Sequence, residues 1–298
     1  MPTPFDPHHL RRNFSRAAAG YMEVAVLQHE VEARLIERLD EIAPTPSRIL
    51  DVGCGPGSGA LALKKRFPKA EVLALDLALP MVKRARRQAG WWRPRYTAIC
   101  ADATALPLAD GCIDLLFTNL CLPWLVDFPA VFSEWRRVLA PGGLLLCSSV
   151  GPETLWELRE AFAQAGEDAP HVHPFAPVQV LGDALMAAGF RDPVLDTDTF
   201  TLTYALPSEA MRDLRAMGAG NALIARRRSL TGKARMQSAF AVWEQHRRAD
   251  GTLPATCEVF YAHAFAPDPG QPRREHGQEI ASVPLGNIPI RRRSPPSD

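Results

Sequence analysis

The chain has 298 residues, of which 47% are hydrophobic, and its formal net charge at pH 7 is +1. This size and apolar content can supply one sizeable core, so we expect a compact enzyme built as one domain with an added cap. The first residues lack the apolar stretch of a secretion signal, and no apolar run approaches the roughly 18 residues that cross a membrane. We therefore expect a cytoplasmic protein with no membrane or nucleic-acid partner.

An amphipathic helix and a glycine-rich turn come first along the chain. Apolar residues recur at helical spacing over Arg11–Leu39. Residues 48–59 then read Arg-Ile-Leu-Asp-Val-Gly-Cys-Gly-Pro-Gly-Ser-Gly, which predicts a buried strand and a turn lined by Gly53, Gly55 and Gly57. Glycines remove the Cβ atoms that would block a ligand, so a nucleotide-like cofactor can approach this backbone. A turn that only joins a strand to a helix is the alternative.

An acidic residue follows the next predicted strand. A helix is predicted over Ser58–Phe67 and a second strand over Glu71–Leu75, directly before Asp76. A carboxylate at that position can accept hydrogen bonds from both hydroxyls of a ribose. A nicotinamide-binding fingerprint is the alternative, but it would place a small neutral residue at Asp51 and a further glycine within the helix. The pattern therefore favours a different nucleotide-like cofactor.

Two further strands predict more ligand contacts at the same edge of a parallel sheet. We expect a third strand over Tyr96–Cys100, followed by Asp102, and a fourth over Cys112–Asn119, followed by Leu120. Ligands bind outside the carboxyl ends of parallel strands, which places Asp102 where it can accept a hydrogen bond from an adenine amino group.

The second half of the chain predicts the remaining strands and a helical cap. A helix that begins near Glu134 is expected to stop at Pro-Gly-Gly, residues 141–143, and to lead into a fifth strand over Leu144–Ser148. Alternating apolar residues predict an antiparallel pair over Pro193–Tyr204 and Thr256–Phe265. The intervening residues 207–249 are rich in Met, Leu and Arg and are predicted to be helical. We expect this insertion to roof the cleft as its substrate-specific element. The composition of residues 266–298 predicts a disordered tail.

Cysteine and histidine usage gives no sign of disulfides or metal. The six cysteines lack C-x-x-C spacing and indicate reduced thiols; they are Cys54, Cys100, Cys112, Cys121, Cys147 and Cys257. The pair His171 and His173 stands in a proline-rich loop without nearby acids or thiols. We expect no metal partner.

Two basic clusters stand out against the near-neutral net charge. The first comprises Lys83, Arg84, Arg86, Arg87, Arg93 and Arg95, and the second comprises Arg226, Arg227, Arg228, Lys233 and Arg235. Each can be a solvated helix face, or it can bind an acidic protein partner or a phosphate.

The glycine turn resembles motif I of the class I S-adenosylmethionine methyltransferases, in which an acid, here Asp51, directly precedes the glycines. This resemblance implies a Rossmann-like, doubly wound seven-stranded α/β sheet with a helical cap before the last strand. It also implies S-adenosylmethionine as methyl donor and S-adenosylhomocysteine as product, with Asp51 near the methionine amino group and Asp76 on the ribose. The N-terminal residues 1–40 would form a lid over the cofactor pocket of a domain spanning 41–265.

Several segments resemble the malonyl-[acyl-carrier protein] O-methyltransferase family of biotin synthesis more closely. The segments are Asn13-Phe14-Ser15-Arg16-Ala17-Ala18 with Tyr21 and Leu27-Gln28, Asn119-Leu120-x-Leu122-x-Trp124, Gly151-Pro152-Glu153-Thr154-Leu155, Leu214 to Asn221 through Arg226 and Leu230-Thr231, and Gly251 to Val259. The likeness covers roughly residues 10 to 265. Pro123 and Cys257 depart from the family pattern and put the substrate contacts there in question. The resemblance implies methylation of the free carboxylate of malonyl on acyl-carrier protein.

A carboxylate acceptor is already ionised near neutral pH, so alignment and exclusion of water are expected to carry the catalysis. We expect the Tyr21 hydroxyl to orient the carboxylate or close the pocket, with aromatic packing as the alternative. We expect Arg226 to counter the carboxylate charge, with a solvated surface arginine as the alternative. The full set of expected cofactor contacts is Asp51, Gly53, Gly55, Gly57, Asp76, Leu77, Asp102, Ala103, Asn119 and Leu120. The expected substrate contacts are Trp124, which core packing explains equally well, and Asn221.

Two other functions remain open from the sequence. Respiratory-complex assembly proteins related to this family use a methyltransferase-like domain to bind or modify a protein partner. A small-molecule methyltransferase, acting on a quinone or similar acceptor, is the other alternative, and Pro123 is the residue expected to lie beside that acceptor. Binding of S-adenosylmethionine followed by a product assay separates these classes.

Overall fold

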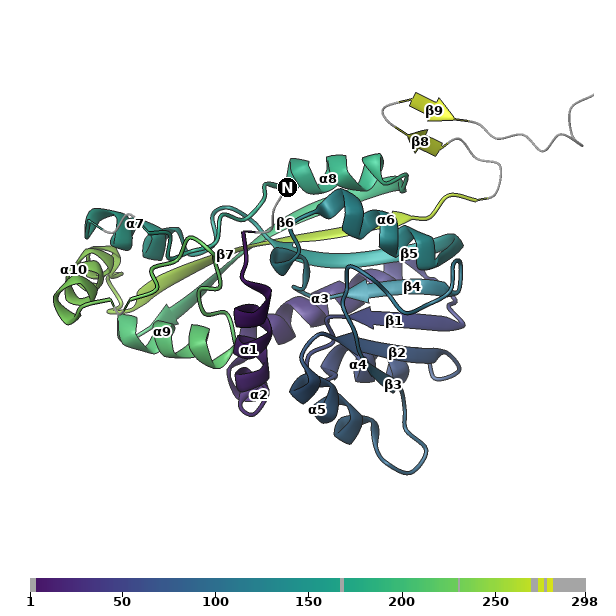
Figure 1. Cartoon of the computed structure of the whole chain (residues 1–298), viewed down its shortest axis with the longest axis horizontal. Helices are drawn as coiled ribbons and strands as arrows, with labels where there is room; N and C mark the ends of the chain where they lie inside the picture. Colours follow the sequence, from purple (N-terminus) through teal and green to yellow (C-terminus); the bar gives the residue numbers. More distant parts are fainter. Residues whose placement is uncertain (1–3, 167–168, 230, 269–272, 276–277, 281–298) are drawn as a thin grey trace, which may run out of the picture.

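A seven-stranded sheet forms the centre of the structure, a computed structural model that describes residues 4–166, 169–229, 231–268, 273–275 and 278–280. Its strands are β1 (Arg48–Val52), β2 (Glu71–Asp76), β3 (Thr97–Cys100), β4 (Ile113–Thr118), β5 (Leu139–Val150), β6 (Arg191–Tyr204) and β7 (Leu253–Phe265). Their order is β3-β2-β1-β4-β5-β7-β6. Neighbours within β1 to β5 pair in parallel, whereas β7 is antiparallel to β5 and β6. The predicted sheet and its antiparallel pair are confirmed (Figure 1).

Helices cover both faces of this sheet (Figure 1). They are α1 (Pro7–Ala17), α2 (Tyr21–Val24), α3 (Val26–Ile42), α4 (Ser58–Arg66), α5 (Leu79–Ala89), α6 (Phe128–Val138), α7 (Trp156–Gln164), α8 (Val178–Ala187), α9 (Pro207–Ala216) and α10 (Lys233–Trp243), with short 3₁₀ turns η1 (Leu122–Trp124) and η2 (Glu244–His246). Successive side chains of β1 point to opposite faces of the sheet and pack in different helix layers. Leu50 packs in the layer that contains Trp135 of α6 and Leu185 of α8. Ile49 packs in the layer with Leu35 of α3, and with side chains of α4 and α5.

The N-terminal segment forms three helices instead of the single helix predicted over residues 11–39. Helix α1 begins at Pro7 because the Asp6 carboxylate caps it, accepting from the His9 N–H at 3.0 Å. The helix is interrupted before α2 at Gly20 and before α3 at Ala25, which caps α3. The alanine-rich sequence favours a continuous helix here, but tertiary packing interrupts it. Helix α1 lies against α5, whereas α3 packs on the sheet.

The predicted helix stop at Pro-Gly-Gly is wrong in its position. Helix α6 ends at Val138, and Leu139 already pairs with Ile113 of β4. Regular pairing with β4 resumes after residues 140–143, which form an irregularity within β5. A Cβ at Gly143 would lie 2.7 Å from the Ala140 carbonyl oxygen, so this bulge requires glycine.

The cap stands on an arm made by the two longest antiparallel strands. Strand β7 pairs with β5 only from Val259 onward, whereas its pairing with β6 continues to Leu253 opposite Tyr204. Helices α7, α9 and α10 surround this projecting end (Figure 1). They share a separate small core that includes Trp243. Within the region predicted as a helical cap, 207–249, α9 and α10 are helices, but the described residues between them, 217–229 and 231–232, are not helical, contrary to expectation.

The predicted disordered tail, residues 266–298, lies mostly outside the described residues. Within it the structure describes residues 266–268 and two short strands, β8 (Arg273–Glu275) and β9 (Gln278–Ile280), which pair antiparallel.

Candidate active site

The glycine turn after β1 is joined to the end of β2 by the Asp76 carboxylate. Asp76 Oδ2 accepts a hydrogen bond from the Gly55 N–H (2.9 Å), and its Oδ1 accepts from the Ala78 N–H (2.7 Å). Burial raises the pKa of Asp76 to about 6, although the hydrogen bonds from these two N–H donors lower it. The carboxylate therefore fixes the glycine turn while it lines a cavity at the carboxyl edge of the sheet.

This smaller cavity has a volume of about 400 Å³ and collects most of the cofactor contacts predicted from sequence. The predicted residues that line it are Tyr21, Gly53, Gly55, Asp76, Leu77, Asp102, Ala103, Asn119, Leu120 and Trp124. They come from α2, η1, the last residue of β2 and the loops after β1, β2, β3 and β4. Those loops meet because parallel strands bring their carboxyl ends to one edge of the sheet.

Two predicted cofactor contacts, Asp51 and Gly57, do not line the cavity. A Cβ at Gly57, whose φ is +100°, would lie 2.2 Å from the Tyr96 hydroxyl oxygen, so packing and backbone conformation require this glycine. Asp51 is 2% exposed, and its Oδ2 has no hydrogen-bond partner among the described residues. Burial, and next the charge of Glu32, raise the pKa of Asp51 well above its usual range. Asp51 is therefore buried beside the glycine turn and does not border the cavity.

Glu32 of α3 brings a further carboxyl group, besides Asp76 and Asp51, to the glycine turn. Its Oε2 accepts a hydrogen bond from the Ser58 hydroxyl (2.8 Å) at the start of α4. Burial raises the pKa of Glu32 to about 7, although the Ser58 hydrogen bond lowers it. Sequence reasoning missed this residue, because nothing in the periodicity of α3 indicates that it faces the glycine turn.

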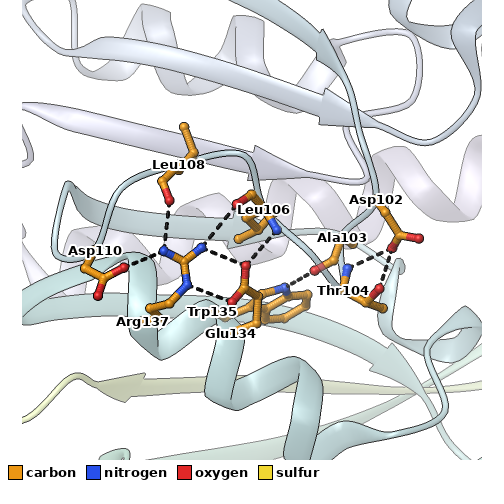
Figure 2. A network of polar contacts seen from close by, with 9 residues as sticks. All are labelled: Asp102, Ala103, Thr104, Leu106, Leu108, Asp110, Glu134, Trp135 and Arg137. Carbon is orange, nitrogen blue, oxygen red and sulfur yellow. Dashed lines mark hydrogen bonds and ion pairs between the residues drawn. The ribbon is translucent and has the colours of Figure 1, made fainter.

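Helix α6 holds the loop that carries Asp102 and Ala103 (Figure 2). The Trp135 indole N–H donates to the Ala103 carbonyl (2.9 Å), and Glu134 Oε1 accepts from the Leu106 N–H (2.7 Å). Arg137 donates to the carbonyl oxygens of Leu106 and Leu108 and to the side chains of Asp110 and Glu134. Sequence reasoning predicted a helix here but assigned it no contact with the loop. Its Glu-Trp-Arg-Arg run is the signal that could have indicated a polar brace.

A polar chain also connects the loop after β4 to α3. The Ser148 hydroxyl donates to Asn119 Oδ1 (2.8 Å) and accepts from the Leu120 N–H (2.9 Å). Asn119 Nδ2 in turn donates to the Gln28 backbone carbonyl (2.8 Å). Leu120 has φ +52° and turns the chain toward η1. These bonds place Asn119 and Leu120 on the cavity wall and tie α3 to the sheet.

Tyr21 stands at the start of α2 and lines the smaller cavity. Burial, and next the charges of Asp76 and Glu32, raise the pKa of the Tyr21 phenol above its usual range. The phenol is therefore neutral near pH 7 and keeps its proton as a hydrogen-bond donor.

A larger cavity, of about 1150 Å³, adjoins the smaller one. Six residues line both cavities: Phe5, Gln28, Leu120, Trp124, Met217 and Ala219. Trp124 packs against Phe5 and Phe14, with ring centroids 5.7 and 5.2 Å apart. Trp124 therefore lies at the junction of the two cavities. Pro123 and Cys257, which depart from the family pattern, both line the larger cavity.

Cationic side chains outnumber acidic ones in the lining of the larger cavity. They are Arg12, Arg215, Arg226, Arg227 and Arg228, whereas the acidic residues are Asp6 and Asp213. Arg226 Nη2 pairs with Asp6 Oδ2 at 3.1 Å, and its Nη1 donates to the Leu223 carbonyl. Asn221 also lines this cavity, but its amide binds the Pro170 carbonyl and the Leu223 N–H. Such a lining favours an anionic ligand.

The first basic cluster, at residues 83–95, lines neither cavity. Within it, Arg86 donates to the Ala98 carbonyl, and Arg95 donates to the carbonyls of Ala89 and Gln88. These two side chains are therefore occupied by backbone contacts.

The described residues form neither a metal cluster nor a membrane-spanning helix. Among the described residues, no three His, Cys, Asp or Glu side chains gather as a metal site would require. His171 stacks on Phe162 with centroids 3.6 Å apart, and His173 lies 4.3 Å from the Phe5 ring. All six cysteines are free thiols. Across these ranges no helix has the length and apolar character to span a bilayer.

Comparison with known proteins identifies the fold. The family described as "Methyltransferase domain" matches residues 50–147. The YcgJ protein of Bacillus subtilis superposes with a TM-score of 0.57 at 14% identity, covering 80% of this chain and 99% of that one. A putative methyltransferase from Bacillus halodurans superposes with a TM-score of 0.54 at 19% identity, covering 79% and 98%. These likenesses confirm the class I methyltransferase fold.

Curated relatives match nearly the whole chain. A malonyl-[acyl-carrier protein] O-methyltransferase of Xylella fastidiosa (strain M23) is 53% identical over 291 residues, which are 97% of this chain and 98% of the relative. A protein of the same name from Halorhodospira halophila is 46% identical over 95% of each chain. The family expected from the sequence motifs is thereby confirmed: the chain belongs to the malonyl-[acyl-carrier protein] O-methyltransferase family.

Proposed function

We propose that this protein transfers a methyl group from S-adenosylmethionine to the free carboxylate of malonyl carried on acyl-carrier protein. The observation that carries the proposal is the pair of adjoining cavities, one built around Asp76 and the glycine turn, the other rich in arginine. The names of its relatives support the same acceptor. The products are the malonyl methyl ester and S-adenosylhomocysteine.

The smaller cavity fits an adenosine-bearing methyl donor. Asp76 uses two backbone N–H donors, and a carboxylate has about four acceptor positions, which leaves room for ribose hydroxyls. A Cβ at Gly55 would meet no atom within 4 Å, so this glycine borders open space. Asp102 lines the same cavity and would accept from the adenine amino group. When bound there, S-adenosylmethionine supplies a methyl group already activated by its sulfonium sulfur.

The larger cavity suits a long anionic acceptor. Its volume of about 1150 Å³ exceeds the range of roughly 300–1,000 Å³ that is usual for small-molecule sites, so it can admit a thioester with part of its carrier arm. Arg226 is the cation that we assign to the acceptor charge. Arg227 and Arg228 extend the positive lining toward an acidic carrier protein.

The chemistry requires alignment more than proton transfer. A malonyl carboxyl group has an ordinary pKa near 4, so its oxygen is already a nucleophile at pH 7. We assign to the neutral Tyr21 hydroxyl a contact that orients this carboxylate and closes the pocket. Trp124, Phe5 and Met217, at the junction, would exclude water from the reacting oxygen.

The product explains why a cell would make this ester. A charged malonyl end would pay a large desolvation cost in the apolar tunnel of a fatty-acid elongation enzyme, and esterification removes that charge. The ester would then prime the chain elongation that leads to pimeloyl, a biotin precursor.

The test is a transfer assay with purified protein, S-adenosylmethionine and malonyl carrier protein. We expect the carrier to gain the mass of one methyl group, and acetyl carrier protein, which has no free carboxylate, to gain none. Binding of S-adenosylmethionine without any mass gain would overturn the proposal and would favour a partner-binding role. Rescue of a biotin auxotroph by the gene is the cellular counterpart.

A further inference from the structure

Gln28 occupies the point where the two cavities meet. It lies in the first turn of α3 and is one of the six residues that line both cavities. The other five side chains are apolar apart from the indole N–H of Trp124. By contrast, Tyr21 lines only the smaller cavity and Arg226 only the larger. Gln28 is therefore the side-chain amide at the place where methyl donor and acceptor would touch.

The Gln28 amide makes no hydrogen bond with any described residue, although its backbone is firmly held. Its Oε1 is buried and has no hydrogen-bond partner in the part of the chain that the structure describes. Its backbone carbonyl accepts from Asn119 Nδ2 at 2.8 Å, which ties α3 to the end of β4. The unpartnered Oε1 is an acceptor, and a half-turn about the last side-chain bond exchanges it with the Nε2 donor, so the amide can present an N–H to an anionic ligand at the junction.

The charge changes of the reaction favour a neutral group at this point. A carboxylate anion and a sulfonium cation become a neutral ester and a neutral thioether, so charge decreases toward the transition state. A cation in contact with the reacting oxygen would stabilise the starting carboxylate more than the transition state and would slow transfer. An amide N–H orients the carboxylate without neutralising it. Arginine therefore belongs farther from the reacting oxygen than Gln28.

Resting on the proposed function, we infer that the Gln28 amide donates a hydrogen bond to the acceptor carboxylate and holds its oxygen toward the methyl donor. This contact selects acyl chains that end in a free carboxylate. An acyl group without that carboxylate, such as acetyl, leaves the amide unpaired in the junction, and a site built for a hydrogen bond rejects such a ligand.

Two variants test this inference. Gln28→Met keeps the length of the side chain but lacks the N–H, and we expect kcat/KM for malonyl carrier protein to fall roughly 10- to 100-fold. The dissociation constant of S-adenosylmethionine should stay within roughly threefold of wild type, because the backbone contact to Asn119 remains. His29→Gln, one position along the same helix and outside both cavity linings, is the control, and its kcat/KM should stay within the same range.

Gln28→Glu adds a second measurement, the pH dependence of kcat/KM, which a change in packing alone would not alter. Its carboxylate repels the acceptor at pH 8, but at lower pH the protonated form can donate in place of the amide. We expect its kcat/KM relative to wild type to rise at least several-fold from pH 8 to pH 6. Wild-type kcat/KM in Gln28→Met, or a pH-independent ratio in Gln28→Glu, would overturn the inference. Absence of transfer by the wild-type protein would instead defeat the proposed function.

Discussion

The indole N–H of Trp135 donates a hydrogen bond to the backbone carbonyl of Ala103 across 2.9 Å. Trp135 belongs to α6, and Ala103 lines the smaller cavity next to Asp102. A fully buried side chain from the helix layer thus sets the position of a loop at the edge of the sheet. Affinity for the methyl donor is therefore expected to depend on a residue that does not line its cavity.

Substitution Trp135→Phe tests this dependence. We expect the free energy of unfolding to fall by about 1–3 kcal/mol, because the Ala103 carbonyl loses its indole partner. The dissociation constant of S-adenosylmethionine, measured by calorimetry, should rise roughly 3- to 10-fold as the loop loosens. Trp243→Phe is the matched control, since this equally buried indole donates to the Pro254 carbonyl (3.0 Å) in the cap. Equal affinity losses in both variants would contradict a local effect.

Alanine substitutions at Gly55 and Gly57 should have different effects, one on the binding of S-adenosylmethionine and the other on the free energy of unfolding. Gly57→Ala places a Cβ 2.2 Å from the Tyr96 hydroxyl oxygen at φ +100°, so we expect a loss of roughly 2–4 kcal/mol in unfolding free energy. Gly55→Ala meets nothing within 4 Å, and its φ of +52° costs only about 1–2 kcal/mol. Its methyl group should instead weaken binding of S-adenosylmethionine at least tenfold. Urea unfolding and calorimetry check the two effects, and a reversed pattern would contradict the assignment.

Tyr21→Phe should reduce turnover while sparing affinity. The substitution removes the hydroxyl but keeps the ring that packs near Ala78 and Met81. We expect kcat to fall roughly 100-fold through misalignment of the acceptor, with the dissociation constant of S-adenosylmethionine within a few fold of wild type. Tyr261→Phe is the control, because that hydroxyl has no partner among the described residues and lines neither cavity. An unchanged kcat would remove Tyr21 from the mechanism.

The raised pKa of Glu32 predicts a pH-dependent stability. With a pKa of about 7 in the folded protein and 4.5 ordinarily, Glu32 keeps its proton where the unfolded chain has lost it. The stability linked to this group is fully present below about pH 4.5 and is lost as the pH rises through about 7. Glu32→Gln, which can still bond Ser58, should therefore raise the unfolding free energy at pH 8 by about 1–3 kcal/mol.

At pH 5 the same substitution should change the unfolding free energy little, because Glu32 is then protonated in the folded wild type. Urea titrations at the two pH values, without S-adenosylmethionine, measure the difference. Asp51 and Asp76 also have raised pKa values, and the Glu32 charge contributes to that of Asp51, so part of the gain at pH 8 comes from relief of repulsion between Glu32 and Asp51. A gain of equal size at both pH values would contradict the assigned proton.

Variants of Arg226 and Asp6 distinguish two roles of Arg226, which are binding of the acceptor charge and anchoring of α1. Arg226→Met removes the cation assigned to the acceptor, and we expect KM for malonyl carrier protein to rise roughly tenfold or more. Asp6→Asn breaks the same ion pair but keeps the cation, and asparagine caps α1 about as well as aspartate. Its KM should stay within roughly threefold of wild type. If both variants behave alike, Arg226 anchors α1 and has no direct role with the acceptor.

Much of the cofactor half could be predicted from the sequence, because its signals are local. Gly55, Asp76 and Asp102 each follow a predicted strand, and parallel strands bring such positions to one edge without further information. Their common cavity therefore follows from chain order and strand direction. The antiparallel arm could likewise be read from alternating apolar residues in β6 and β7.

The sequence by itself determined the sheet, the glycine turn and the family, since these depend on neighbouring residues and on motifs. Only the tertiary structure decided why Gly57 is glycine, because the obstructing hydroxyl belongs to Tyr96, far along the chain. It also decided that Gln28, Trp124 and Met217 together line the junction of two cavities. Such a junction joins three distant segments through packing, and no local periodicity or spacing encodes contacts between them.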